Sequence, residues 1–256
     1  MGKQLYETQP QFRQIVEECD RLLQPHLQQS LLSIFNDEAL LTQPGYARPA
    51  VFVWEYALAA LWRSWGVQPS LIMGAGIGEY VAACVAGVFS LEDGLRLVTQ
   101  QESWTEFDQV AKQVQFQTPQ IPMVSTFNGQ LLAADYIPNT DHWRRHWQAP
   151  ALFKAAMLAV REKGCEFFLE IGSHPQLSEM RQPGAWLQSS DDWAVLLHSL
   201  MTLYINGVVI DWQGFEQGYQ RRRVVLPTYP FERKRYWLDP AVIRSFSKKE
   251  ENSCKE

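Results

Sequence analysis

The chain has 256 residues, 46% of them hydrophobic and 20% charged, which is the composition of a globular protein with a sizeable core. Its formal net charge of −5 argues against a nucleic-acid-binding surface, and its four cysteines show neither the C-x-x-C spacing of a zinc site nor a disulfide framework. No segment is long and apolar enough to span a bilayer and no secretory signal is visible, so we expect a cytoplasmic protein that does not bind membranes.

The first part of the chain is predicted to be helical. Apolar residues at helical spacing between Phe12 and Leu22 predict one helix, and Leu31–Leu41 predicts a short one. Arg48–Trp65 has an apolar face, a proline near its start and Gly66 as a stop signal. This pattern predicts a longer helix that packs on the core.

A short strand, a glycine-rich turn and a helix are predicted between Leu71 and Gly87. Gly74, Gly76 and Gly78 stand at alternate positions, which permits a tight backbone turn. The N–H groups at the start of the following helix would then point toward a group bound at the turn. This is the pattern of a nucleophile elbow, in which a central serine is held exposed above a sheet. Here the centre is Gly76, which has no side chain to attack with.

The same glycines are also compatible with a second interpretation, in which the turn binds a dinucleotide. A Gly-x-Gly-x-x-Gly motif needs its third glycine where this chain has Glu79. A negative side chain at the start of the helix would also compete with a bound phosphate. We therefore favour the elbow, and we expect no cofactor and no metal.

The rest of the chain alternates between predicted helices and strands. Ser90 is predicted to cap a helix, with Asp93 at the capping-box position. Ile121–Thr126 and Cys165–Ile171 are predicted strands. Helices are predicted at Thr140–Trp147, Ala151–Glu162 and Leu203–Val208, whereas Val195–Leu200 fits either a strand or a buried helix.

These motifs together resemble the acyltransferase domain of modular type I polyketide synthases, whose elbow reads Gly-His-Ser-x-Gly-Glu. The residues in register with that family motif are Gly74, Ile77, Gly78, Glu79 and Tyr80. Ala75 replaces the histidine and Gly76 replaces the nucleophilic serine. Leu169–Gly172, with His174 and Pro175, resembles the family's Leu-Glu-Ile-Gly-x-His-Pro, which makes His174 and Glu79 possible cleft residues.

The resemblance also implies that other catalytic parts of the family are missing. Counting along the matched run places Gln101 where the family has an arginine that pairs with the carboxylate of a malonyl-type substrate, and a neutral amide cannot form that ion pair. In the family, a ferredoxin-like small subdomain and a motif with the catalytic histidine lie between the positions of Trp104 and Phe107. The family's first strand and the loop with its oxyanion-hole glutamine also have no counterpart, so we expect an unpaired position in the sheet.

The fold implied by the resemblance is α/β, with a mostly parallel sheet and flanking helices. It corresponds to the acyltransferase large subdomain, with the ferredoxin-like small subdomain deleted and an extended C-terminal linker. We expect the reduced domain at residues 1–216, the linker at 217–240 and a disordered tail at 241–256. The linker includes Leu226–Trp237, which is rich in proline and aromatic residues and should be extended.

We expect a catalytically degenerate acyltransferase-like domain with a structural, docking or interaction role in a polyketide synthase, and not an enzyme. The alternative is a functional acyl- or malonyl-CoA:acyl-carrier-protein transferase whose missing parts are supplied in trans or replaced. Ser103, Ser125 and Cys84 are the candidates for a substitute nucleophile. The partners implied by the resemblance are ketosynthase and acyl carrier protein domains, or a trans-acting acyltransferase.

Overall fold

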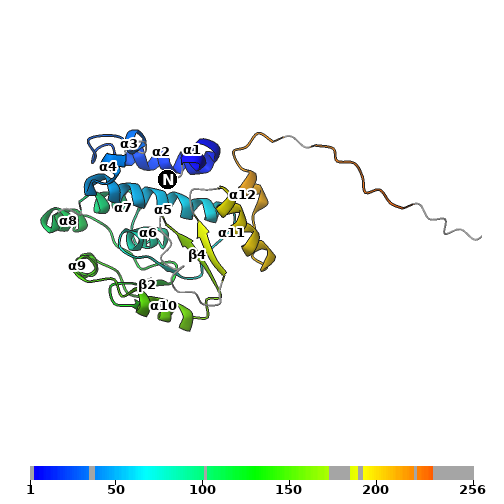
Figure 1. Cartoon of the computed structure of the whole chain (residues 1–256). Helices are drawn as coiled ribbons and strands as arrows, with labels where there is room; N and C mark the ends of the chain where they lie inside the picture. Colours follow the sequence, from blue (N-terminus) through cyan, green and yellow to red (C-terminus); the bar gives the residue numbers. More distant parts are fainter. Residues whose placement is uncertain are drawn as a thin grey trace, which may run out of the picture. The chain divides into compact units, whose positions relative to one another are not determined.

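A computed structural model of the chain describes residues 3–34, 38–100, 103–172, 185–189, 193–221 and 224–232. Residues 1–219 form one compact unit and residues 220–256 form a second (Figure 1). The predicted tail and the end of the predicted linker, from residue 233 onward, lie outside the described residues.

The N-terminal half of the first unit is built around one long helix, α5 (Pro44–Ser64). It packs against α2 (Pro10–Leu23), α6 (Ile77–Val85) and α7 (Leu91–Thr99). The short helices of this half are α1 (Lys3–Thr8), α3 (Leu31–Ile34) and α4 (Glu38–Leu41). Helix α5 begins four residues before the predicted start, because Pro44 suits a first helical turn and Pro49 removes only one hydrogen bond inside the helix.

The described strands form two small sheets. In the first, β1 (Ile72–Met73) runs parallel to β2 (Met123–Ser125), which pairs antiparallel with β3 (Gln130–Leu131). In the second, β4 (Phe167–Ile171) runs parallel to β5 (Ala185–Ser189), with Phe167 opposite Ala185. The predicted α/β class is confirmed, and among the described residues the sheet is divided into two parts.

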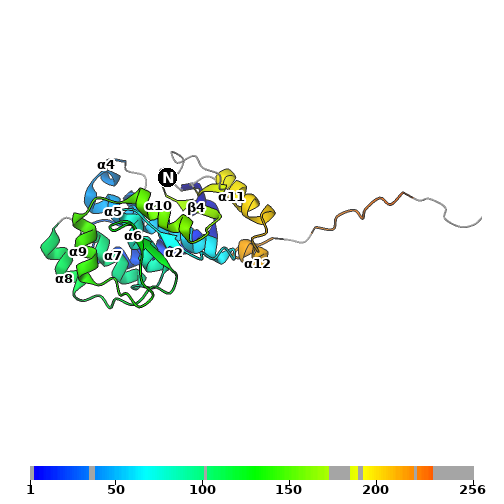
Figure 2. The same cartoon turned by 90° about the horizontal axis from the view of Figure 1, so that it is seen from below.

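Helices lie on both sides of these strands. Figure 1 shows α2 and α5 on one side and α9 (Thr140–Gln148) and α10 (Phe153–Glu162) on the other, and Figure 2 shows the same molecule from below, from the side of α10. The remaining helices are α8 (Trp104–Ala111), α11 (Trp193–Ile205) and α12 (Trp212–Glu216). The segment Val195–Leu200, whose sequence fits either a strand or a buried helix, belongs to α11.

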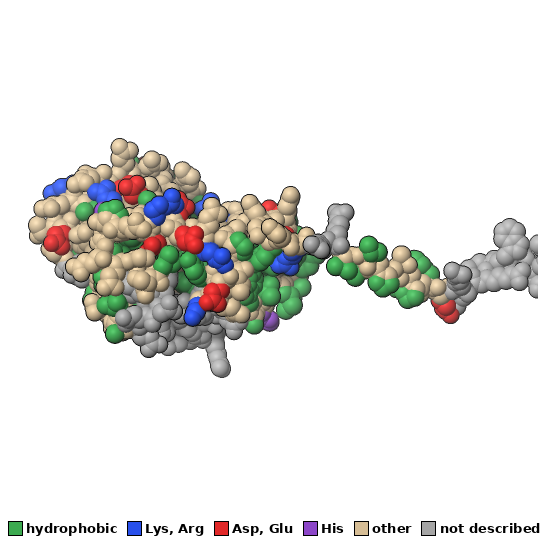
Figure 3. Space-filling model, turned by 90° about the horizontal axis from the view of Figure 1, so that it is seen from above, with side chains coloured by type: hydrophobic (Ala, Val, Ile, Leu, Met, Phe, Trp, Pro, Cys, Tyr) green, Lys and Arg blue, Asp and Glu red, His purple; other side chains and the backbone are tan. Residues whose placement is uncertain are grey.

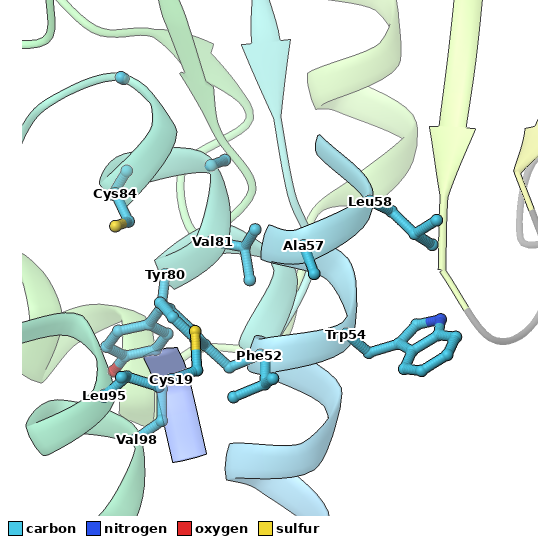
Figure 4. Packing of buried hydrophobic residues seen from close by; sticks show 14 of the residues in the cluster. Cys19, Phe52, Trp54, Ala57, Leu58, Tyr80, Val81, Cys84, Leu95 and Val98 are labelled. Atoms are coloured by element: carbon cyan, nitrogen blue, oxygen red, sulfur yellow. The ribbon is translucent and has the colours of Figure 1, made fainter. Parts of the chain in front are cut away.

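The core centres on the apolar face of α5. In Figure 4, Phe52 and Ala57 of this helix lie on the side of Tyr80 and Val81 of α6, whereas Trp54 and Leu58 point to its other side. The same buried cluster includes Cys84 of α6, Leu95 and Val98 of α7 and Cys19 of α2. Full burial of one large apolar side chain stabilises a fold by about 1.5–3 kcal/mol. Trp62 and Trp65, at the end of α5, are also fully buried in this core.

The predicted cap is present at the start of α7. The Asp93 N–H donates to the Ser90 hydroxyl over 3.1 Å. In the second unit, described residues 224–232 have no regular secondary structure and expose their apolar side chains. None of the helices in the described ranges is long and apolar enough to cross a membrane.

Candidate functional site

The turn between β1 and α6 has the backbone of a nucleophile elbow. Gly76 caps α6 with φ +56° and ψ −121°, a left-handed conformation that favours glycine. A Cβ atom on Gly74 would lie 2.0 Å from the Gly78 carbonyl oxygen, so only glycine fits at position 74. The strand-to-helix turn is therefore as sharp as a nucleophile elbow requires.

The top of the turn faces open space. A Cβ atom on Gly76 would meet no heavy atom within 4 Å. The adjacent Ile77 N–H stands at the first position of α6, where the helix itself offers no acceptor. In a nucleophile elbow that N–H contributes to the oxyanion hole, so the turn keeps one donor but carries no nucleophile.

A cavity of about 600 Å³ opens at this turn. Its walls combine one cation, one imidazole and several apolar groups. The lining residues are Arg48, Gly76, Ile77, Tyr80, Thr126, Phe127, His146, Trp147, Ala149 and Ala151. Tyr80 is held in place by stacking on buried Trp143, with ring centroids 4.4 Å apart.

A buried polar cluster lies beneath the turn. Glu79, in the first turn of α6, is fully buried and accepts hydrogen bonds from the hydroxyls of Ser125 and Thr126 and from the Thr126 N–H at 3.0 Å. Nε2 of His146 lies 3.3 Å from its carboxylate, and Nε2 of His142 lies 3.8 Å away. The cluster ties α6 to the end of β2 and to α9.

The pKa of Glu79 reflects two opposing effects. Burial raises the pKa, but His142, His146 and the Ser125 hydroxyl outweigh burial and hold it well below its usual range. Glu79 is therefore an ionised structural anchor and is not among the residues that line the cavity. Both carboxylate oxygens of Glu79 already accept hydrogen bonds. Among the described residues, no group of three or more His, Cys, Asp or Glu side chains could hold a metal ion.

A second carboxyl, that of half-buried Glu55 on α5, lies on another side of the turn. Its Oε2 would be 3.2 Å from a Cβ atom on Gly78, and its Oε1 would be 3.5 Å from one on Gly172. Burial raises the pKa of Glu55 to about 7. Neither oxygen has a hydrogen-bond partner among the described residues.

The candidates for a substitute nucleophile do not line the cavity. Cys84 is buried in α6, and burial raises the pKa of its thiol to about 12, so the reactive thiolate is suppressed. Ser125 is fully buried and donates to Glu79. Ser103 stands at the start of α8.

The structure brings together only part of the predicted site. The predicted elbow residues, Gly74, Ala75, Gly76, Ile77 and Gly78, lie in the turn between β1 and α6. Gln101 and His174 lie outside the described residues. The sequence reasoning missed His142 and His146, although their spacing of four residues places both side chains on one face of α9.

A family model described as "Acyl transferase domain" matches residues 1–106. Among curated proteins, the chain is 28% identical over 355 residues to the PKS-NRPS hybrid synthetase ATPKS of Aspergillus niger, and 28% identical over 343 residues to polyketide synthase GfsB of Streptomyces halstedii. The alignments include 93% and 94% of this chain but only 19% and 6% of those proteins. Because each alignment is longer than the 256 residues available here, each relative has internal residues without a counterpart in this chain.

Solved acyltransferase domains share the fold. The acyltransferase domain of ZmaA matches with a TM-score of 0.77 at 21% identity, over 89% of this chain and 76% of that one. The acyltransferase domain from the second module of the salinomycin polyketide synthase matches with a TM-score of 0.77 at 22% identity, over 90% and 76%. The expected acyltransferase fold is confirmed.

Proposed function

Starting from its similarity to polyketide synthase acyltransferase domains, we propose that this chain has lost acyl transfer and acts as a structural or docking domain within a polyketide synthase. The main observation behind the proposal is that Gly76 occupies the nucleophile position of the turn and has no side chain. The turn keeps the backbone that presents a nucleophile to the cavity, but the presenting position has no side chain. Covalent acyl transfer requires a nucleophile with a base within hydrogen-bond reach.

The connection between α7 and α8 supports the same proposal. Helix α7 ends at Thr99 and α8 begins at Trp104. The family-model match ends at residue 106, and the curated relatives carry internal residues that this chain lacks. We infer that the small subdomain, with its catalytic histidine, is deleted at this connection.

Exposed apolar surface supports a docking role. Helix α11 buries Leu196, Leu200 and Leu203 against the core but exposes an apolar strip on its other side. Figure 3 shows hydrophobic side chains at the end of the unit that carries α11 and α12, and along the described part of the second unit. The exposed apolar residues of the α11–α12 end are Leu197, Met201, Tyr204, Ile205, Val209 and Trp212.

Exposed apolar patches of this kind mark sites of protein association. We infer that the partners are ketosynthase and acyl carrier protein domains, or a trans-acting acyltransferase. The polyketide synthases among the relatives support this choice.

The decisive experiment is intact-mass spectrometry of the chain after incubation with malonyl-CoA and acetyl-CoA, with and without an acyl carrier protein. We expect no mass gain on the chain and no carrier loading above background. A solved acyltransferase domain with an intact elbow serine, tested in parallel, shows that the reagents are competent.

A stoichiometric acyl adduct would overturn the proposal in favour of an active transferase. Peptide mapping would then identify the substitute nucleophile. Thr126 is the first residue to inspect, because it lines the cavity and its hydroxyl already donates to the Glu79 carboxylate.

A further inference from the structure

The cavity at the turn is lined by basic, polar and apolar groups and by no acidic side chain. Arg48 supplies a positive charge, and none of the described residues that line the cavity is an aspartate or a glutamate. The volume of about 600 Å³ lies within the range of protein sites for small organic molecules. The lining therefore favours an anionic ligand over a cationic one.

A backbone donor at the start of α6 is available to such a ligand. The Gly78 N–H donates to the Ala75 carbonyl over 3.0 Å. The Glu79 N–H donates to the Gly76 carbonyl over 3.2 Å, so both donors are used within the turn. The Ile77 N–H, at the first position of the helix, has no acceptor in the helix. Because α6 has nine residues, the partial positive charge at its start adds to this donor.

The absence of a side chain at Gly76 leaves room for a ligand beside the Ile77 N–H. A Cβ atom on Gly76 would meet no heavy atom within 4 Å. Because Gly76 carries no nucleophile, a ligand bound there forms no covalent adduct at this position. The turn is therefore suited to reversible binding.

The negative charge of Glu79, in the first turn of α6, lies outside the cavity. Its carboxylate is turned toward Ser125, Thr126 and His146, and Glu79 is not among the residues that line the cavity. The donors around the carboxylate offset its charge, whereas the Arg48 side chain lines the cavity itself. Glu79 therefore opposes a bound anion less than its place in the sequence suggests.

His146 gives a second, independent sign that a ligand is missing. This residue lines the cavity, and its side chain is only 9% exposed. Nε2 lies 3.3 Å from the Glu79 carboxylate, whereas Nδ1 is buried and has no hydrogen-bond partner among the described residues. Buried polar atoms normally have a partner, because leaving one without any costs free energy. A polar group bound beside His146 would supply that partner.

Two aromatic rings of the lining are held in place by their neighbours. Trp147 packs edge-on against Trp104 and Phe107 of α8, with ring centroids 5.9 and 5.2 Å apart. Phe127 packs edge-on against His142, with ring centroids 4.9 Å apart. A planar aromatic ligand therefore meets preformed apolar surfaces, which lowers the entropic cost of binding.

We propose that this cavity binds an aromatic carboxylic acid reversibly, with the carboxylate at Arg48 and the Ile77 N–H and the ring system against Phe127 and Trp147. An arginine guanidinium forms paired hydrogen bonds with a carboxylate, which it cannot form with a neutral amide. A single arginine balances one carboxylate but would leave part of the charge of a phosphate dianion unbalanced. The proposal goes beyond the docking role and requires no acyl transfer.

The test uses the full chain and 2-naphthoate, a free acid that has no thioester to transfer. Isothermal titration calorimetry measures binding, and hydrogen–deuterium exchange locates the site. We expect saturable one-to-one binding with slower exchange in the peptide that contains Ile77. 2-Naphthamide, which has nearly the same shape but no charge, should bind at least tenfold more weakly.

Two variants separate the charge from the cavity. Arg48→Gln should weaken 2-naphthoate binding at least fivefold and leave 2-naphthamide binding within twofold, because only the charged pair is lost. Arg63→Gln, at an exposed residue of the same helix that does not line the cavity, is the matched control and should bind like the unmodified chain. Ala149→Phe places a ring in the cavity from an extended position after α9, so it should weaken binding of both compounds.

Each alternative outcome overturns the proposal. Absence of 2-naphthoate binding would show that the cavity is not a site for this class of ligand. Equal binding of 2-naphthamide, or an equal loss in the Arg63→Gln variant, would remove the role of Arg48. Protection confined to the exposed apolar residues of α11 and α12 would show that the probe binds to that surface instead.

Discussion

Two glutamates beside the same turn, buried Glu79 and half-buried Glu55, have pKa values shifted in opposite directions. Glu79 is surrounded by donors, so its pKa falls below the usual range although burial alone would raise it. No donor among the described residues opposes the effect of burial on Glu55, whose pKa rises to about 7. Changes of stability with pH should therefore distinguish the two carboxyl groups.

Glu55→Gln is expected to stabilise the isolated chain at neutral and alkaline pH. In the unfolded chain Glu55 ionises near its ordinary pKa of 4.5, whereas in the folded chain it stays protonated up to about 7. The wild-type fold therefore loses stability as pH rises from 4.5 to 7, by up to about 3 kcal/mol. Urea unfolding at pH 4 and pH 8 should show equal stability at pH 4 and a more stable variant at pH 8. Equal stability at both values would contradict the assignment.

Glu79→Gln is expected to destabilise the fold by about 3 kcal/mol at pH 7, because it breaks a buried charged network. The lowered pKa means that the ionised form stabilises the fold above pH 4.5, and that this contribution is lost as the pH falls toward the folded value. The difference between variant and wild type should therefore shrink at pH 3. Chemical denaturation at pH 3 and pH 7 measures it, and a difference that grows on acidification would count against the network.

At the scale of elements, the elbow turn can be tested by restoring its side chain. Gly76→Ser is expected to cost about 1–3 kcal/mol, since φ is +56° there, although space for the side chain is open. Gly164→Ser is the matched control, because Gly164 also has a positive φ and open surroundings but does not line the cavity. We expect similar destabilisation in thermal unfolding and no loading of a carrier protein by either variant. Loading by Gly76→Ser alone would show that only the serine is missing, with His146 as the available base.

The elements themselves were largely predictable, because their signals are local. Ser90 with Asp93, and the alternate glycines of the elbow, specify a cap and a turn within a few residues. Helix α11 was ambiguous because it is apolar on almost every side, so periodicity gave no preference. The cluster of Glu79 with His142 and His146 could not be predicted, because it joins residues more than sixty positions apart through the packing of α9 on the core.

At the scale of the whole molecule, the two units should differ in what they contribute to stability. The first unit holds the core, whereas the described residues of the second expose their apolar side chains. Helix α12 belongs to the first unit and covers Trp65. Phe215 packs on Trp65 with ring centroids 5.0 Å apart, and the Asp211 N–H donates to the Trp65 carbonyl.

We expect deletion of residues 220–256 to leave the melting temperature within about 2 °C of the full chain, since the described residues among them expose their apolar side chains. Deleting residues 207–256 should cost about 3 kcal/mol, or about 6–12 °C, because it also removes Phe215 and uncovers Trp65. Calorimetry of both truncations measures the difference. If the shorter deletion alone destabilised the fold to this extent, the second unit would be part of the core. If it did not, its exposed apolar residues would be free to bind a partner.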